Sequence, residues 1–303
     1  METSISFKQI AKRFVPAKLH PYIGGARRRL IANPVRIELQ WKRLLRDGSL
    51  TKDQLAMLET VNRQIHHRDG MYAGKAEEYF AVGLSAVECV DKVLGLSQTT
   101  VVTEVLDLPS GYGRELRFFL QRFPNATFTA CDIQPGAVSF CAKAFGALPV
   151  NSKANISELS FDRKFDLIWC GSLLTHLDEP STRSLLNVFS DHLTANGVMI
   201  VTTHGDYVAQ QMRAGATYEL PAGATRQMAT RYEEYGHAYH DYSRGLGYFE
   251  FHPEKSGYGV SLMSPGWFRS LAADLKLNEV YFGARGWADH QDVFALGHNL
   301  RRD

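Results

Sequence analysis

The sequence lacks the features that mark disulfide-rich, membrane-spanning and metal-centred proteins. It has only four cysteines in 303 residues, all in apolar segments and none at metal-ligand spacing from another: Cys89, Cys131, Cys141 and Cys170. No apolar run approaches the ~20 residues of a membrane-spanning helix, and the first residues lack the apolar core of a secretory signal. We therefore expect reduced thiols in the protein core and a cytoplasmic location.

Net charge is also small, but it is unevenly distributed. The whole chain carries +2, while residues 1–46 contain eleven Lys and Arg against two Glu. This segment therefore carries +9 and the remainder −7. Such asymmetry predicts a peripheral contact of this arm with an anionic surface or partner. The alternative is a solvated arm, or a surface that packs on an acidic face.

Length and composition indicate an ordinary soluble protein with one large domain or a domain plus an appendage, since 45% of the residues are hydrophobic and 22% are charged. Before residue 100 the pattern is helical. The run Thr51-Lys52-Asp53-Gln54 has the form of a capping box, which predicts a helix start, and a longer helix is predicted to end at Gly95. We interpret the adjacent His66 and His67 as surface residues, because neighbours on a helix end point apart.

The main domain is organised around residues 104–132, which indicate a strand, a glycine turn, a helix and a second strand. An apolar run before Asp107 suits a buried parallel strand. Gly111 and Gly113 then allow a tight turn and a close approach of the backbone to a ligand. Asp107 and Asp132 would end neighbouring strands of a doubly wound sheet, and such sheets bind their ligands in that crevice.

The glycine turn does not fit a dinucleotide fingerprint. The pattern G-x-G-x-x-G/A requires a small residue where this chain has Leu116. Residues 107–113 (DLPSGYG) instead resemble motif I of the class I S-adenosylmethionine (SAM)-dependent methyltransferases, [D/E]-x-G-x-G-x-G, with Pro109 at the position of the first glycine. This resemblance implies that the acid near the turn attracts the ammonium group of SAM. It also implies that the acid ending the second strand accepts both ribose hydroxyls.

A second stretch carries the same resemblance. Residues 164–180 (KFDLIWCGSLLTHLDEP) resemble the family's fourth strand and the loop that covers the sulfonium side, and a helix is predicted over 182–193. The loop 151–156 lies where the family places contacts to adenine. Residues 280–296 have the spacing of a terminal hairpin, and an antiparallel last strand is typical of class I methyltransferases. The resemblance covers about residues 100–300.

The resemblance implies an α/β fold with a doubly wound, Rossmann-like sheet of seven strands, an antiparallel last strand, an N-terminal helical extension and an insertion after the fifth strand. We expect a basic arm and helical lid over residues 1–99 and the methyltransferase domain over residues 100–303. Tyr72 and Tyr79 are lid candidates, with core aromatics as the alternative. The implied cofactor is SAM. The expected cofactor-binding residues are Asp107, Pro109, Gly111, Tyr112, Gly113, Asp132, Ile133, Asn155, Ile156, Cys170, Gly171, Ser172, Tyr72 and Tyr79.

Residues 204–262 interrupt the alternation of strands and helices. They hold eight of the thirteen tyrosines and fall beside the methyl-transfer crevice, where loops carry specificity. We expect an acceptor cap that includes Tyr239 and Tyr242. A plain capping subdomain is the alternative.

The candidate catalytic residues are His204, His176 and Asp206. Methyl transfer is an in-line displacement in which a hydroxyl acceptor must also lose a proton. His204 follows the fifth strand directly, and Asp206 is placed to orient its imidazole. His176 is a second candidate base, or a residue that packs against or caps the next helix. We expect no metal, although Asp178, Glu179 and Asp206 offer one alternative; the first two also read as acids favoured at a helix start.

The stretches LPSGYG and WCGSLLTHL resemble a bacterial subgroup associated with glycan assembly. We therefore expect a SAM-dependent methyltransferase (EC 2.1.1) that methylates a hydroxyl of a small-molecule or carbohydrate acceptor. A natural-product O- or N-methyltransferase is one alternative, and a non-catalytic SAM-binding module is another. No Asn/Asp-Pro-Pro-Tyr motif follows the fourth strand, so we expect no nucleic-acid partner.

Overall fold

A seven-stranded mixed sheet forms the centre of the protein. The computed structural model describes residues 32–48, 50–221, 223–242 and 257–299, so most of the basic arm lies outside the described residues. The strands of this sheet are β1 (Glu104–Asp107), β2 (Thr127–Asp132), β3 (Leu148–Asn151), β4 (Phe165–Cys170), β5 (Leu193–Thr203), β8 (Asn278–Trp287) and β9 (Gln291–Gly297).

The strand order is β3-β2-β1-β4-β5-β9-β8. The first five strands pair in parallel, while β9 is antiparallel to both of its neighbours, β5 and β8. This arrangement confirms the predicted Rossmann-like fold with an antiparallel last strand. The hairpin is longer than predicted, because β8 continues to Trp287 and pairs there with Gln291.

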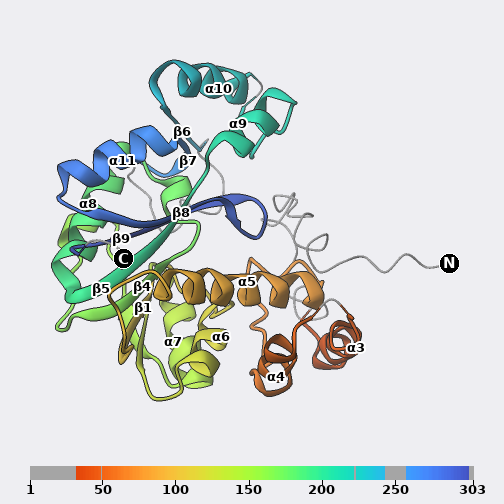
Figure 1. The fold of residues 1–303 in the computed structure, drawn as a ribbon. Coiled ribbons are helices and arrows are strands. Elements are labelled where there is room, and N and C mark those ends of the chain that lie inside the picture. The colour runs from red at the N-terminus through yellow and green to blue at the C-terminus, as the bar shows by residue number, and fades with distance from the viewer. Residues whose placement is uncertain (1–31, 49, 222, 243–256, 300–303) are drawn as a thin grey trace.

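Helices cover both faces of the sheet (Figure 1). One face packs on α5 (Ala76–Leu94), α6 (Leu116–Arg122) and α7 (Pro135–Phe145), and the other on α8 (Glu179–His192) and α11 (Pro265–Asp274). Neighbouring strand residues alternate between the two cores, as Val105 and Leu106 do, because side chains along a strand have a period of two. Among the described helices, none is both long and apolar enough to cross a membrane.

Two further helices, α3 (Pro34–Leu44) and α4 (Lys52–Thr60), precede α5. The capping box is confirmed: the Thr51 hydroxyl accepts from the Gln54 amide, and the Gln54 side chain accepts from the Thr51 amide. Trp41 is buried against Phe80 of α5 with ring centroids 4.8 Å apart. This contact joins the N-terminal helices to the main core.

The helix after β4 begins earlier than predicted. Asp178 accepts a hydrogen bond from the Ser181 amide at 2.9 Å, which caps α8 and starts it at Glu179 rather than Thr182. Asp178 is thus a helix-start acid. Among the described residues, no three His, Cys, Asp or Glu side chains are arranged to hold a metal ion.

The insertion has its own small core. It contains α9 (Asp206–Arg213), α10 (Ala224–Tyr235), β6 (His237–Asp241) and β7 (Gly259–Met263), and β6 and β7 form a separate two-stranded sheet. In Figure 1, α9 and α10 lie side by side beyond the main sheet. The Met263 amide donates to the His204 carbonyl at 2.8 Å. The end of the insertion is therefore tied to the residue that follows β5.

Candidate functional site

The carboxyl ends of β1, β2 and β4 meet at one edge of the sheet. Asp107 ends β1 and Asp132 ends β2, and β1 pairs in parallel with both β2 and β4. Both aspartates are buried. The structure thus brings together the two acids that the sequence pattern singled out.

The glycine turn is fastened to the end of β2. Gly111 and Gly113 have φ values of 50° and 72°, a left-handed region that glycine adopts at little cost. The Gly111 amide donates to Asp132 Oδ2 at 2.8 Å, and the Gln134 amide donates to Oδ1 at 2.9 Å. A carboxylate has about four acceptor positions, so Asp132 retains capacity for ribose hydroxyls. The peptide before Pro109 is cis.

The two glycines differ in the space around them. A Cβ on Gly113 would lie 2.4 Å from the Phe145 ring, whereas one on Gly111 would meet nothing within 4 Å. A side chain at either position would have to adopt a left-handed backbone, which destabilises both variants. The difference in stability between the two variants therefore measures the steric clash with Phe145. We expect Gly113→Ala to lower the free energy of unfolding by about 1–3 kcal/mol more than Gly111→Ala does. Urea unfolding of both variants measures this difference, and equal losses would contradict it.

Asp107 has the features of a cation-binding side chain. Neither of its carboxylate oxygens has a hydrogen-bond partner among the described residues. Burial raises the pKa of Asp107 well above its usual value, and the charges of Glu115 and Asp132 raise it further. A buried acceptor without a partner is costly. The ammonium group of SAM would satisfy it, so the residues at this edge fit the expected cofactor.

A hydrogen-bond network holds the loop after β4 in place. The Ser172 amide donates to Thr202 Oγ1 at 2.7 Å, and the Gln291 side chain donates to Ser172 Oγ at 2.9 Å. Thr202 in turn donates to Gln291 at 2.5 Å. Gly171 is enclosed by the rings of Trp169 and Trp287. These contacts place Gly171 and Ser172 directly after β4, which ends at Cys170 between β1 and β5. Gln291 was not foreseen from the sequence.

Two predicted lid residues lie in the core. Tyr72 and Tyr79 are both buried, with ring centroids 5.6 Å apart. The Tyr79 hydroxyl donates to Asp69 at 2.6 Å and accepts from Arg117 at 3.2 Å. These contacts favour the core-aromatic alternative. Asp69, buried just before α5, carried no motif in the sequence.

Tyr112 in the glycine turn is also buried, and it has an unexpected partner. The His66 ring stacks on it with centroids 4.5 Å apart and planes 5° apart. The interpretation of His66 and His67 as surface residues was therefore wrong, since both are half-buried. The reason is that the chain after α4 runs against the glycine turn instead of into solvent, as the hydrogen bonds from Arg117 to the Asn62 and Gln64 carbonyls show.

The residues expected to contact adenine follow the carboxyl ends of β2 and β3. Ile133 is half-buried directly after Asp132, and Ile156 is half-buried at the start of a short 3₁₀ helix, η1 (Ile156–Glu158). Asn155 is exposed, and its side-chain amide donates to Glu158 at 2.7 Å. Their contact with adenine stays a prediction.

His204 is buried at the end of β5. Its Nδ1 atom has no hydrogen-bond partner among the described residues, and its ring lies 5.6 Å from those of Tyr218 and His290. Burial lowers the pKa of His204 well below 6.5, and the nearby His290 and His176 lower it further. The sequence did not indicate a role for His290, in the turn between β8 and β9, because the residues next to it form no recognisable motif.

Asp206 does not orient His204, contrary to expectation. It begins α9, and its carboxylate accepts from the Tyr232 hydroxyl at 2.7 Å. The helix start turns the side chain toward α10. The contacts of His176 favour the alternative that this residue packs within the protein. Its Nδ1 lies 2.8 Å from the Gly259 carbonyl and 3.1 Å from the Tyr242 hydroxyl.

Comparison with known proteins agrees with this geometry. Residues 106–199, from β1 into β5, match the model of a family described as a methyltransferase domain. A curated relative, the malonyl-[acyl-carrier protein] O-methyltransferase of Acetivibrio thermocellus, is 26% identical over 103 residues, which are 34% of this chain and 36% of that protein. The alignment thus spans about a third of the relative's length.

Solved structures give a fold-level likeness. The glycopeptide N-methyltransferase MtfA is 15% identical, with a TM-score of 0.48 and coverage of 72% of this chain and 90% of that one. A SAM-dependent methyltransferase from Clostridium acetobutylicum is also 15% identical, with a TM-score of 0.46 and coverage of 71% and 89%.

Proposed function

Since this chain belongs to the class I SAM-dependent methyltransferases, we propose that it transfers a methyl group from SAM to a hydroxyl of a small-molecule or carbohydrate acceptor. Asp107, Asp132 and the Gly111–Gly113 turn would hold the cofactor, which supplies the activated methyl group when bound. The loop at Ser172 lies beside this edge and is fixed by Thr202 and Gln291. It would shape the place where the acceptor meets the methyl group.

The observation that carries the hydroxyl assignment is the unpartnered Nδ1 of His204. The backbone of Ser261 forms a hydrogen bond with this imidazole that favours its protonated form, so we assign the ring N–H to that bond and the lone pair to Nδ1. A buried lone pair without a donor is satisfied by a substrate hydroxyl. His204 would then accept the hydroxyl proton as the methyl group is transferred.

The insertion 204–262 supports the same proposal as an acceptor cap. Tyr218 lies against both His204 and His290, and Tyr207 lies against His290 and under Arg285. These rings offer flat apolar surfaces beside the proposed base, which suit a sugar or an aromatic metabolite. Tyr242 reaches His176 from the insertion, and Tyr239 bonds Asp241 within it.

A screen for S-adenosylhomocysteine formation tests the proposal. Sugar nucleotides, free glycans and phenolic metabolites are incubated with the protein and SAM, with a matched set of amines as the comparison. We expect turnover with a hydroxyl acceptor and an O-methyl product by NMR. Turnover with amines alone would replace the proposal with N-methylation. SAM binding without any turnover across the screen would favour a non-catalytic module.

A further inference from the structure

Two large aliphatic side chains are exposed on a single face of α3. Val35 is 69% exposed and Leu39 is 59% exposed, and their spacing of four residues makes them neighbours on the helix surface. Ile37, Trp41 and Leu44 lie on the opposite face, where they are buried in the main core. Packing against the core therefore explains one face of α3, but it does not explain the exposed aliphatic pair.

Basic side chains flank this pair. Arg36, Lys42 and Arg43 are exposed residues of α3, and the helical period places them on or beside the face that carries the aliphatic pair. The one acid within α3, Glu38, is already paired with Arg63 at 3.1 Å. In the part of the chain that the structure describes, the three basic side chains form no ion pair. Together with the aliphatic pair, they make up what we call the outer face of α3.

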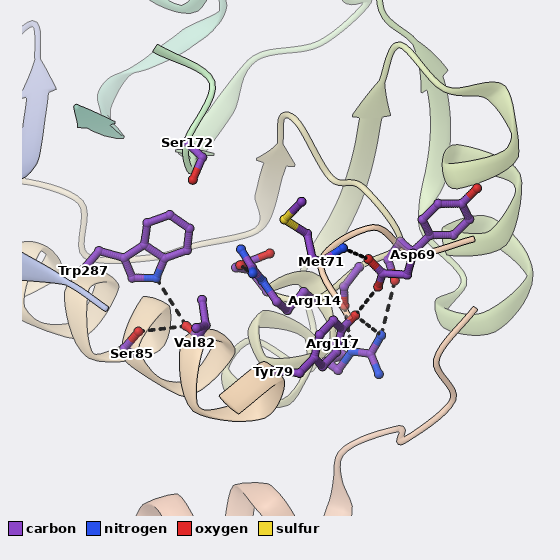
Figure 2. Close-up of polar contacts among 12 residues, drawn as sticks. Asp69, Met71, Tyr79, Val82, Ser85, Arg114, Arg117, Ser172 and Trp287 are labelled. Atoms are coloured by element: carbon purple, nitrogen blue, oxygen red, sulfur yellow. Dashed lines mark hydrogen bonds and ion pairs between the residues drawn. The ribbon is translucent and has the colours of Figure 1, made fainter. Parts of the chain in front are cut away.

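The segment on which α3 rests is tied to the candidate site. The Gln40 side chain donates to the Gly74 carbonyl, just before α5, at 3.0 Å. Early in α5, the Tyr79 hydroxyl bonds both Asp69 and Arg117, as Figure 2 shows, and Arg117 also bonds the glycine turn. In Figure 1, α3 lies at the periphery of the molecule, beyond α5. A partner on the outer face of α3 would therefore be held in a fixed position relative to the site.

An aliphatic pair flanked by positive charge restricts the class of partner. A second copy of the same face would bring like charges together, which opposes association. A nucleic acid would attract the basic groups, but phosphate contacts and base stacking would leave Val35 and Leu39 without an apolar partner. An anionic lipid bilayer offers anionic headgroups for the basic side chains and acyl chains for the aliphatic ones.

We propose that the outer face of α3 binds the surface of an anionic lipid bilayer. Val35 and Leu39 enter the boundary between headgroups and acyl chains, while the basic side chains lie among the headgroups. Two aliphatic side chains give a reversible, peripheral contact. Residues 1–31 contain seven further Lys and Arg, whose charge has the sign that this attraction requires. The inference depends neither on the methyl acceptor nor on the proposed reaction.

Vesicle co-sedimentation of the full chain tests the proposal. The wild type is expected to bind vesicles of phosphatidylcholine with phosphatidylserine, to bind phosphatidylcholine alone much less, and to be released by salt. Lys42→Gln/Arg43→Gln should weaken binding to the anionic vesicles about 25-fold, since each basic group near such a surface contributes about fivefold. Leu39→Ser keeps every charge and should weaken binding about tenfold, because it removes apolar area from the contact.

Arg226→Gln/Arg231→Gln is the matched control. It removes two exposed basic side chains from α10, which lies at the other end of the molecule in Figure 1, and it should bind the anionic vesicles as the wild type does. Equal thermal midpoints check that all variants are folded.

Three results would overturn the proposal. The first is a wild type that does not bind the anionic vesicles. The second is wild-type affinity in Lys42→Gln/Arg43→Gln, which would assign the binding to another part of the chain. The third is wild-type affinity in Leu39→Ser combined with loss in the charge variant, since a purely electrostatic contact would indicate a polyanion such as RNA.

Discussion

Replacing His204 with alanine is expected to lower kcat by about 10²–10⁴-fold, the usual cost of removing a general base, while SAM affinity stays unchanged. The reason is the buried Nδ1 without a partner, in an imidazole that lies after β5 and outside the glycine turn. Steady-state kinetics with the acceptor found by screening measures kcat. Calorimetry with SAM measures the binding that should persist.

The pH dependence follows from the direction of the pKa shift. Burial and the neighbouring histidines lower the pKa of His204, so the imidazole is neutral and able to accept a proton throughout the neutral range. Wild-type kcat should therefore be flat above pH 6.5 and fall only as acid protonates the ring. Protonation of this site also favours the unfolded chain, in which the pKa returns to about 6.5. The contribution of His204 to the free energy of unfolding should accordingly be complete above about pH 6.5 and decrease as the pH falls below that value.

His176→Ala is the control for this prediction. Its Nδ1 is already engaged with the Gly259 carbonyl and the Tyr242 hydroxyl, so its loss should affect kcat much less. Near-full turnover by His204→Ala would remove the assignment of the base. The same conclusion would follow if His176→Ala proved the more damaging change.

Replacing Asp132 with alanine is expected to weaken SAM binding by about 1.5–3 kcal/mol, the range for hydrogen bonds to a charged acceptor, or roughly 10- to 150-fold in Kd. Two effects contribute to this loss. The variant lacks the acceptor proposed for the ribose hydroxyls, and it releases the Gly111 and Gln134 amides that shape the turn. Calorimetry with SAM gives the change in Kd.

Asp166→Ala is the matched control for Asp132→Ala. Asp166 lies at the opposite end of β4, where it accepts from Thr103 and Thr194. Its loss should lower the urea midpoint and leave SAM affinity as it was. Equal weakening of SAM by both variants would show that Asp132 acts only through general stability. Tight binding of NAD by the wild type in place of SAM would contradict the cofactor itself.

The features that the sequence determined by itself are those written in contiguous residues. An apolar run, followed by an acid and two glycines within the seven residues 107–113, predicts a strand end and a tight turn. Both glycines have the left-handed backbone that the turn requires. The capping box at Thr51 formed as predicted, because its partners are three residues apart. The hairpin spacing near the C-terminus gave the antiparallel last strand.

Only the tertiary structure decided which polar side chains are already paired. Arg114 and Arg117 are near neighbours in the chain, yet Arg114 pairs with the adjacent Glu115 while Arg117 donates to the distant Asn62 and Gln64 carbonyls. Asp206 sits two residues from His204 but bonds Tyr232 of α10. His290 and Gln291 reach the site from the far end of the chain. The reason is physical: desolvation and hydrogen-bond pairing depend on atoms that the fold brings close, and a local sequence pattern does not encode those atoms.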